Sequence, residues 1–313
     1  MTVLVTGAAG FLGQRITADL RGDGIEVVGL DVVPGGDDDA LVEAVDVQDR
    51  GALGQLMRDH GVRSVVHAGG ISGPHVANNK PALVAAVNIM GTTNLLECAR
   101  ELALPGRIVL LSSSSVYGEA AEASSRQTPC VETLALLASE PYGASKVASE
   151  AMLRAYVEQS GVDAVALRVS IVYGAGRQTY CGITAMIHQA MDTGTIVLDQ
   201  DSDVPLPWIH VTDIVSAVRT ALDAPRVSLR NEGTYAFNVT GPGSPTFCQI
   251  AATIADTIPG TSVVQGDDLD KYGMNARTMS LTAIERELGW KPHVPIDDGV
   301  RLLVDSERVR RGA

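Results

Sequence analysis

The sequence TVLVTGAAGFLG, at residues 2–13, joins a short apolar run to a glycine-rich turn. The run at residues 2–6 predicts a buried parallel strand, and the periodic apolar residues at 14–20 predict a helix after the turn. Glycines let the backbone approach a phosphate, and a helix N-terminus adds N–H groups and a positive dipole. The stretch therefore predicts a pyrophosphate site, with the spacing G-x-x-G-x-x-G instead of G-x-G-x-x-G.

The second predicted strand, at residues 26–30, ends in Asp31. An acidic residue about 20 positions after the glycines accepts hydrogen bonds from an adenosine ribose. No Lys or Arg follows it before the aspartates at residues 37–39, so a 2′-phosphate would meet negative charge. The pattern favours NAD over NADP. The alternative is that Asp31 is only a turn residue at the end of a strand.

Two further predicted strands end in small or polar residues. Residues 62–67 end at His67 and are followed by small residues, whereas residues 107–111 run into four serines at 112–115. Ligands bind at the carboxyl ends of the strands in parallel sheets, so we expect both ends to line a site; the serines could also form a polar turn. His67 is more typical of a hydrogen-bonded structural histidine than of a catalyst. Asn88 lies inside a predicted helix at 81–102, where it is unfavourable unless it bonds another group.

A helix is predicted from Pro141 onward, and it carries Tyr142 and Lys146 one turn apart. Residues four apart lie on one helix face, so the two side chains point the same way. A nearby ammonium favours the phenolate and lowers the pKa of a tyrosine, which makes it usable as a general acid or base. The alternative is an exposed Tyr and Lys without a shared role.

The alternation of strands and helices predicts an α/β fold with a Rossmann-type doubly wound parallel sheet and a smaller C-terminal α/β substrate domain. The NAD-binding domain is predicted to span residues 1–172, with a strand at 162–172. Segments near 206–241 are expected to return to the sheet, through residues 208–213 and a last strand at 236–241. The substrate domain is expected at 173–205 and 242–313, with helices at 246–258 and 282–288.

Composition narrows the possible partners. The 313 residues carry a net charge of −13, which argues against nucleic acid or an anionic membrane. The four cysteines show no C-x-x-C spacing and no paired His ligands, so no metal site is expected. We expect free thiols and a location in the cytoplasm. No signal peptide is expected, because residues 2–6 already form a predicted strand. No uninterrupted apolar run of 18 residues is present, so no membrane partner is expected.

Together these motifs resemble the extended short-chain dehydrogenase/reductase family, also called the NAD-dependent epimerase/dehydratase family, over essentially the whole chain. The resemblance implies that Tyr142 is the acid/base and that Lys146 holds the nicotinamide ribose and lowers the Tyr142 pKa. It implies that Ser113, four residues before Tyr117, orients the reacting hydroxyl. The cofactor-binding residues expected from the motifs and the resemblance are Gly7, Gly10, Phe11, Leu12, Gly13, Asp31, Asp46, Val47, Ala68, Gly69, Gly70, Asn88, Tyr142, Lys146 and Val169.

Departures from the family pattern bear on the substrate. Leu206 stands where nucleotide-sugar members carry an Arg for the substrate diphosphate, and Ile171 stands where they tend to have Asn. A diphosphate needs charge-assisted partners, so we expect a smaller substrate. Residues 67–72 are similar to a loop of uronate dehydrogenases, which oxidise free sugar acids. The expected substrate contacts are Ser72, Ser114 and Arg177, although Arg177 could instead be a solvated loop residue.

The first hypothesis is an NAD-dependent dehydrogenase that transfers hydride at a secondary alcohol of a sugar or sugar acid. The second is a nucleotide-sugar 4-epimerase of the UDP-glucose 4-epimerase type. A third, of another class, is a non-catalytic NAD-binding redox sensor, although such relatives typically lose the Tyr or the Lys. A homodimer is expected through the helices at 81–102 and 142–159, because relatives in the family often pair through them.

Overall fold

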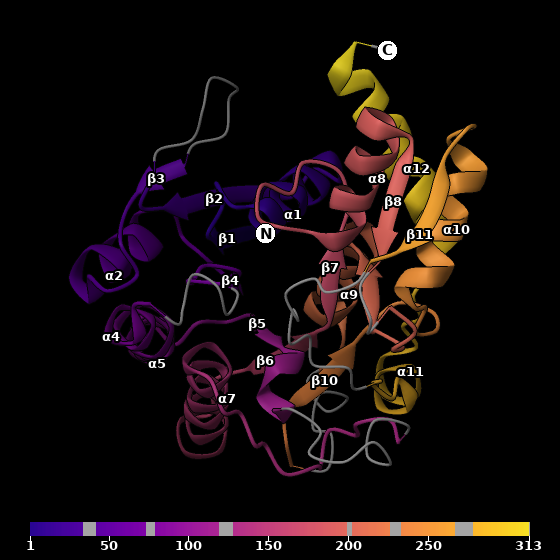
Figure 1. Ribbon diagram of the computed structural model, residues 1–313. Coiled ribbons are helices and arrows are strands. Elements are labelled where there is room, and N and C mark those ends of the chain that lie inside the picture. The colour runs from indigo at the N-terminus through magenta and orange to yellow at the C-terminus, as the bar shows by residue number, and fades with distance from the viewer. Residues whose placement is uncertain are drawn as a thin grey trace.

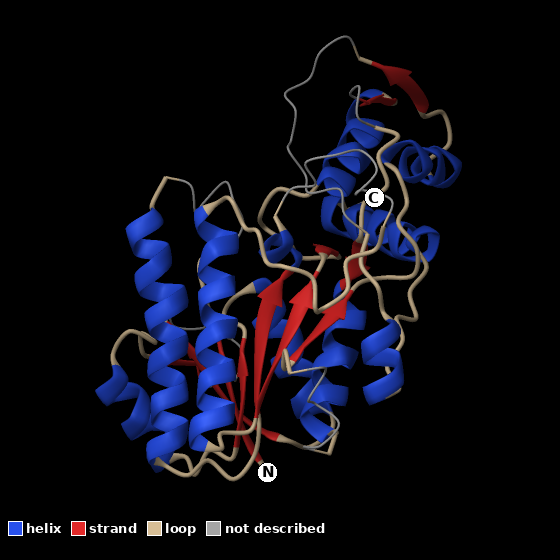
Figure 2. Ribbon diagram, turned by 90° about the horizontal axis from the view of Figure 1, so that it is seen from below, coloured by secondary structure: helices blue, strands red, loops and turns tan. Residues whose placement is uncertain are grey.

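The computed structural model describes residues 1–33, 42–72, 79–118, 128–198, 202–225, 233–266 and 278–312. A seven-stranded parallel sheet in the order β10-β6-β5-β4-β1-β2-β3 lies at its centre, and helices cover both faces (Figures 1 and 2). This arrangement confirms the predicted fold class.

The strands of this sheet are β1 (Thr2–Thr6), β2 (Glu26–Asp31), β3 (Val42–Ala44), β4 (Ser64–His67), β5 (Ile108–Ser113), β6 (Ala164–Val169) and β10 (Ala236–Val239). The helices packed on it are α1 (Phe11–Gly22), α2 (Arg50–Asp59), α4 (Pro81–Val84), η1 (Ala85–Met90), α5 (Gly91–Glu101), α7 (Pro141–Ser160), α9 (Val211–Asp223) and α11 (Thr282–Leu288). Every residue of β1, β4, β5, β6 and β10 is buried. Continuous apolar runs are the sequence form of strands that are covered on both faces.

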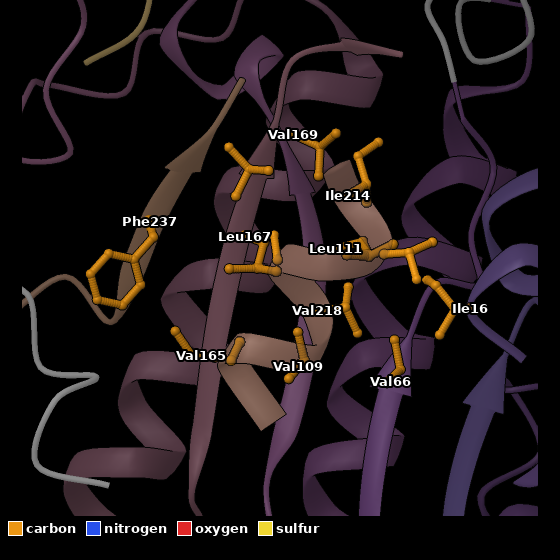
Figure 3. Close-up of a cluster of buried hydrophobic side chains, with 14 of the residues drawn as sticks. Ile16, Val66, Val109, Leu111, Val165, Leu167, Val169, Ile214, Val218 and Phe237 are labelled. Carbon is orange, nitrogen blue, oxygen red and sulfur yellow. The ribbon is translucent and has the colours of Figure 1, made fainter. Parts of the chain in front are cut away.

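Successive side chains of each strand point to opposite faces of the sheet, so they pack in two separate hydrophobic cores. Val3 and Val5 pack with α1, α9 and α11 on one face, in the cluster drawn in Figure 3. Leu4 packs with α2, α5 and α7 on the other face. The sheet therefore forms the middle layer of three, and it fixes the places from which the loops at its carboxyl edge start.

Helices α4, η1 and α5 follow one another without a break, and η1 is a π-helical segment. Among the described residues, only Pro81–Glu101 has the length and apolar composition of a membrane-spanning helix, and a core helix can meet the same criteria. Its Leu95 and Leu96 are buried in the core shared with α2 and α7. π-helical turns occur frequently at functional sites, and this one contains Asn88.

A smaller lobe lies beyond the carboxyl edge of the sheet (Figure 2). It contains the two-stranded sheet of β8 (Thr195–Leu198) and β11 (Ser262–Gln265), and the helices α8 (Gly182–Thr193), α10 (Phe247–Thr257) and α12 (Ile296–Arg311). Two short strands, β7 (Ile171–Tyr173) and β9 (Trp208–His210), pair with each other beside it. The lobe has its own hydrophobic cluster, which includes Tyr173, Leu206 and Trp208.

Three details differ from the sequence prediction. The strand expected at 162–172 is divided into β6 and β7 at Ser170. Residues 208–210 were expected in the main sheet, but β9 pairs with β7 in a separate two-stranded sheet, and it is α9 that returns to cover the main sheet. Helix α11 was expected in the substrate domain, yet its Ala283 and Ile284 pack in the core of the main sheet. Short apolar runs fix the element type but not the strand or face that they meet.

The strand order reverses between β1 and β4, which are paired with Thr6 opposite His67. Such a switch point opens a crevice for ligands at the carboxyl edge of a doubly wound sheet. The loops that follow these strands are in close contact, because a Cβ added at Gly7 would lie 2.6 Å from the Cα of Gly69. The fold therefore brings together the two loops that were predicted to bind the cofactor.

A substitution at Asn238 of β10 would test how much the polar contacts of this buried side chain contribute to stability. Its side chain is buried, accepts from the Tyr117 hydroxyl at 2.6 Å and donates to the carbonyl of Cys130 at 2.8 Å. Asn238→Leu would leave these buried groups without that partner, at about 1–3 kcal/mol each. We expect the free energy of unfolding, measured by urea denaturation, to fall by roughly 3 kcal/mol; a loss near zero would contradict this account.

Candidate active site

The glycine loop forms a tight backbone cradle at the start of α1. Gly7 has φ of +67°, a conformation that favours glycine, and a Cβ added at Gly13 would lie 2.0 Å from the Gly7 carbonyl oxygen. Gly10 is the N-cap of α1, and no side chain caps this helix end. The N–H groups of the first turn, which includes Phe11 and Leu12, can therefore face an anion. These features fit the pyrophosphate of a dinucleotide.

Asp31 lies beside this cradle at the end of β2. Its carboxylate accepts hydrogen bonds from the backbone N–H of Ala9 at 3.1 Å and of Val33 at 3.3 Å. The bond to Ala9 places a negative charge against the glycine loop, where an adenosine ribose would be held. The aspartates at residues 37–39, which entered the cofactor argument, lie outside the described residues.

The other expected cofactor contacts differ in what their side chains do. Asp46 accepts hydrogen bonds from the backbone and side chain of Gln48. The side chain of Val47 is buried next to Gly91, and that of Val169 is buried in the core of the sheet (Figure 3). Any cofactor contact from these two residues would therefore come mainly from the backbone. Asn94 supports this segment, because its side chain donates to the Val47 carbonyl at 3.1 Å. The sequence argument had assigned Asn94 no role.

Asn88 connects the loop after β4 to the helix of Tyr142. Its side chain accepts from the Ile71 N–H at 2.8 Å, and it donates to the Ile71 carbonyl at 3.0 Å and to the Ser145 hydroxyl at 2.9 Å. A Cβ added at Gly70 would lie 2.9 Å from the Asn88 Oδ1. The expectation that this buried helical Asn must bond another group is confirmed. Ser145 was missed, although its place between Tyr142 and Lys146 was a usable signal.

His67 is a structural residue, as the sequence argument favoured. Its ring lies between two hydroxyls, with Nδ1 2.6 Å from Thr6 Oγ1 and Nε2 3.1 Å from Thr92 Oγ1. Burial, assisted by the positive charge of Lys146, lowers the pKa of His67 to about 3. The imidazole is therefore neutral at physiological pH and connects β1, β4 and α5.

The predicted catalytic residues meet at the carboxyl end of β5. Ser113 ends that strand, and its side chain is hydrogen-bonded to that of Tyr142 at the start of α7. Lys146 is buried, with its Nζ 5.9 Å from the centre of the Tyr142 ring and 2.9 Å from the Leu111 carbonyl oxygen, to which it donates. A hydroxyl, a phenol and an ammonium therefore gather beside the two cofactor loops.

The pKa values in this cluster differ from the simplest expectation. Burial raises the pKa of Tyr142, and the hydrogen bond with Ser113 opposes that shift. Burial lowers the pKa of Lys146 to about 8, and the charge of Glu150 opposes that shift. The expected lowering of the Tyr142 pKa by Lys146 is thus not what this arrangement gives, because desolvation is the largest effect on both groups.

A second buried polar group lies one helical turn beyond Lys146. Glu150 of α7 forms an ion pair with Arg168 of β6 at 2.7 Å and accepts from the Ser112 hydroxyl of β5. Arg168 also donates to the Tyr117 hydroxyl at 2.9 Å. Sequence reasoning did not assign Glu150 a role, although its spacing from Tyr142 and Lys146 placed all three on one helix face.

The three expected substrate residues are less closely gathered. Ser72 is exposed beyond the Asn88 contact, and Ser114 is partly buried directly after Ser113. Arg177 lies in the loop after β7, where it donates to the Val172 carbonyl and to the Thr179 hydroxyl. Its guanidinium is therefore partly engaged by the protein itself.

Comparison with known proteins agrees with this geometry. The model of the NAD dependent epimerase/dehydratase family matches residues 3–240. The chain belongs to this family. Curated relatives include a UDP-glucose 4-epimerase of Mycolicibacterium smegmatis, 27% identical over 98% of this chain and 99% of that protein. Another is a dTDP-glucose 4,6-dehydratase of Xanthomonas campestris pv. campestris, 26% identical over 97% of this chain and 92% of that protein.

Two solved structures have a similar fold. The UDP-glucose 4-epimerase of Thermus thermophilus, solved in complex with NAD, is 26% identical, with a TM-score of 0.83 over 98% of this chain and 99% of that one. The L-threonine dehydrogenase of Phytophthora infestans has a TM-score of 0.88 over 99% of this chain and 100% of that one, at 23% identity. The second likeness concerns the fold alone.

The chain is therefore an NAD-dependent enzyme of the epimerase/dehydratase family. The glycine cradle, the uncapped start of α1 and the carboxylate of Asp31 are the features that fit NAD. When bound, NAD accepts a hydride from a substrate carbon or returns it. The residues of this chain contribute the binding site and the groups that can move the proton.

Cofactor preference should depend on the charge of Asp31. Asp31→Asn keeps an acceptor for the Ala9 N–H but removes the charge that repels a 2′-phosphate, so the preference for NAD over NADP should narrow. Asp31→Ala removes both and should also weaken NAD binding by roughly 10- to 100-fold, given about 1.5–3 kcal/mol for a hydrogen bond to a charged group. Dissociation constants for both cofactors provide the measurement. A wild-type protein that prefers NADP would refute this reading.

Proposed function

We propose that the protein oxidises a secondary alcohol of a sugar or sugar acid, with Tyr142 as the general base for the hydroxyl proton. The hydrogen-bonded pair of Tyr142 and Ser113, at the carboxyl end of β5 and beside the cofactor loops, is the observation that carries this proposal. General acid–base catalysis needs a proton acceptor within hydrogen-bonding reach of the reacting group.

Ser113 and Lys146 assist Tyr142 in different ways. The Ser113 hydroxyl, fixed at the end of a buried strand, can orient the substrate oxygen toward the phenol. Lys146 places a positive charge 5.9 Å from the Tyr142 ring centre, and the phenolate that forms on proton loss is stabilised by that charge. Because Lys146 is buried and Tyr142 is partly buried, solvent screens this attraction less than it would at the surface.

A free and carboxylated small carbohydrate is the substrate that we favour. Leu206, at the position of the family diphosphate-binding Arg, is buried in the cluster of the smaller lobe. Ile171 is partly buried at the position of the family Asn. Arg177, Ser72 and Ser114 remain the proposed substrate contacts, with a carboxylate competing for the donors that Arg177 now directs to Val172 and Thr179.

A nucleotide-sugar 4-epimerase is the second candidate. The observation that favours it is that relatives are similar over nearly the whole chain. One of them is the UDP-glucose 4-epimerase of M. smegmatis. Oxidation and epimerisation share the first proton and hydride transfer, so the same catalytic residues serve both. A binding site for the diphosphate would then use groups other than residues 171 and 206.

The expected homodimer and the cytoplasmic location stay predictions. For the dimer, the surface that we propose combines α7 with the helix Pro81–Glu101, on which Leu83 and Met90 are exposed. A second copy would cover these apolar side chains.

Turnover should depend on the Tyr142 hydroxyl. In Tyr142→Phe, kcat should fall by about 10²–10⁴-fold, because general acid–base catalysis contributes a factor of that size, while NAD affinity stays near that of the wild type. Tyr156→Phe is a matched control on the same helix, since the Tyr156 hydroxyl donates to Glu97 on the surface, and its kcat should be unchanged. Wild-type turnover in purified Tyr142→Phe would reject the assignment.

The substrate class can be tested with a panel of free sugar acids, polyols and nucleotide sugars, with NADH absorbance and product analysis as readouts. We expect NADH to form with a sugar acid. For that substrate, Arg177→Leu should raise KM roughly 10- to 100-fold through loss of a charge-assisted contact of about 1.5–3 kcal/mol. Arg58 is exposed on α2, and the control variant Arg58→Leu should leave KM unchanged. Epimerisation of a UDP-sugar without net NADH would favour the second candidate instead.

A further inference from the structure

A buried layer of polar contacts joins α7 to the sheet directly beneath the catalytic residues. The Glu150 carboxylate is held by Arg168, with Nε 3.1 Å from both carboxylate oxygens and Nη2 2.7 Å from Oε2. The Ser112 hydroxyl of β5 donates to the same carboxylate at 2.5 Å. Glu150 and Arg168 are both nearly inaccessible to solvent, at 6% and 2% exposure.

This layer shares strand β5 with the catalytic groups. Lys146 donates to the carbonyl of Leu111, the next residue Ser112 donates to Glu150, and Ser113 then bonds Tyr142. Three consecutive residues of one strand therefore contact three residues of α7 that are spaced by four along the helix. A shift of α7 along β5 would break all three contacts together.

The charged and titratable groups around Lys146 come from several elements. On α7, Glu150 lies one turn after it and Tyr142 one turn before. His67 of β4 faces it but is uncharged at physiological pH. Behind Glu150 lie Arg168 of β6 and, in contact with Arg168, the uncharged Tyr117. Among these described groups, Glu150 is the negative charge whose effect on Lys146 is favourable.

We propose that Glu150 is a positioning residue for catalysis, which holds Lys146 charged and in place beside Tyr142 through its contacts with Arg168 and Ser112. The inference rests on the proposed roles of Tyr142 and Lys146. It goes beyond a purely structural ion pair, because it requires the Glu150 charge to act on Lys146.

A comparable ion pair lies away from Lys146. Arg107, just before β5, donates to both carboxylate oxygens of Asp163, just before β6, at 3.1 and 3.0 Å. This pair lies at the start of β5 and β6, at the opposite end from Ser112 and Arg168, and its Arg is also buried. Asp163→Asn therefore controls for the loss of a carboxylate from a buried Arg without a change near Lys146.

The measurement uses lysine labelled at its side-chain carbon and nitrogen. The chain has only four lysines, so an NMR titration can follow each ammonium, and Lys146→Met identifies the signal of Lys146. The titration requires no turnover, so its outcome is independent of whether the proposed reaction is correct. The pH profile of kcat, recorded for the same variants, then relates Lys146 to activity.

In Glu150→Gln, a negative charge next to Lys146 is lost and the charge of Arg168 becomes uncompensated. Both changes disfavour the ammonium, so the titration midpoint of Lys146 should move down by about one pH unit or more, as expected for buried charges one helical turn apart. The loss of kcat at alkaline pH, where Lys146 becomes neutral, should move down with it. Glu150→Asp should restore part of the shift, and Asp163→Asn should leave the midpoint at its wild-type value.

Glu150→Gln could fail to fold, since removal of one partner from a buried ion pair is strongly destabilising. Glu150→Gln combined with Arg168→Met removes both charges and keeps the volume, and the Lys146 midpoint should again lie below that of the wild type. An unchanged midpoint in either folded variant would overturn the proposal. An equal shift in Asp163→Asn would also overturn it, because the effect would then reflect general loosening of the sheet.

Discussion

The close backbone contact between the loops after β1 and β4 is the constraint on which the rest of the site depends. No side chain fits at Gly7, where an added Cβ would lie 2.6 Å from Gly69. Thr6 reinforces the contact, because its hydroxyl accepts from the Gly69 N–H at 3.0 Å and contacts the neutral ring of His67. The glycine cradle and the loop that Asn88 contacts are thereby fixed relative to each other, and Asn88 in turn connects that loop to α7 through Ser145.

Local patterns in the sequence were sufficient for much of this. The strand, glycine turn and helix at residues 2–20 predicted the cradle, and the four-residue spacing predicted that Tyr142 and Lys146 share a face. The need for a partner of Asn88 was also readable, because a buried amide inside a helix is costly when unpaired. In each case the determining interactions are close in sequence, or are demanded by the chemistry of one residue.

Other features depend on partners that lie far away in the chain. Glu150 and Arg168 are 18 positions apart and meet only because α7 crosses β5 and β6. The pairing of β9 with β7 instead of the main sheet, and the packing of α11 on that sheet, follow from the same competition between surfaces of similar apolar character. The Tyr142 pKa is raised where the sequence argument expected it to be lowered, because desolvation is the largest effect on that group, and burial depth is not visible in a spacing.

The smaller lobe is built around a hydrophobic cluster separate from the two that hold the sheet. The proposed acid/base group and its supports come from β5, β6 and α7, whereas Leu206 belongs to the cluster of the lobe. The proposed acid/base groups and the smaller lobe are therefore packed around separate cores. For protein engineering, this means that the interior of the lobe can be redesigned while β5, β6 and α7 keep their alignment.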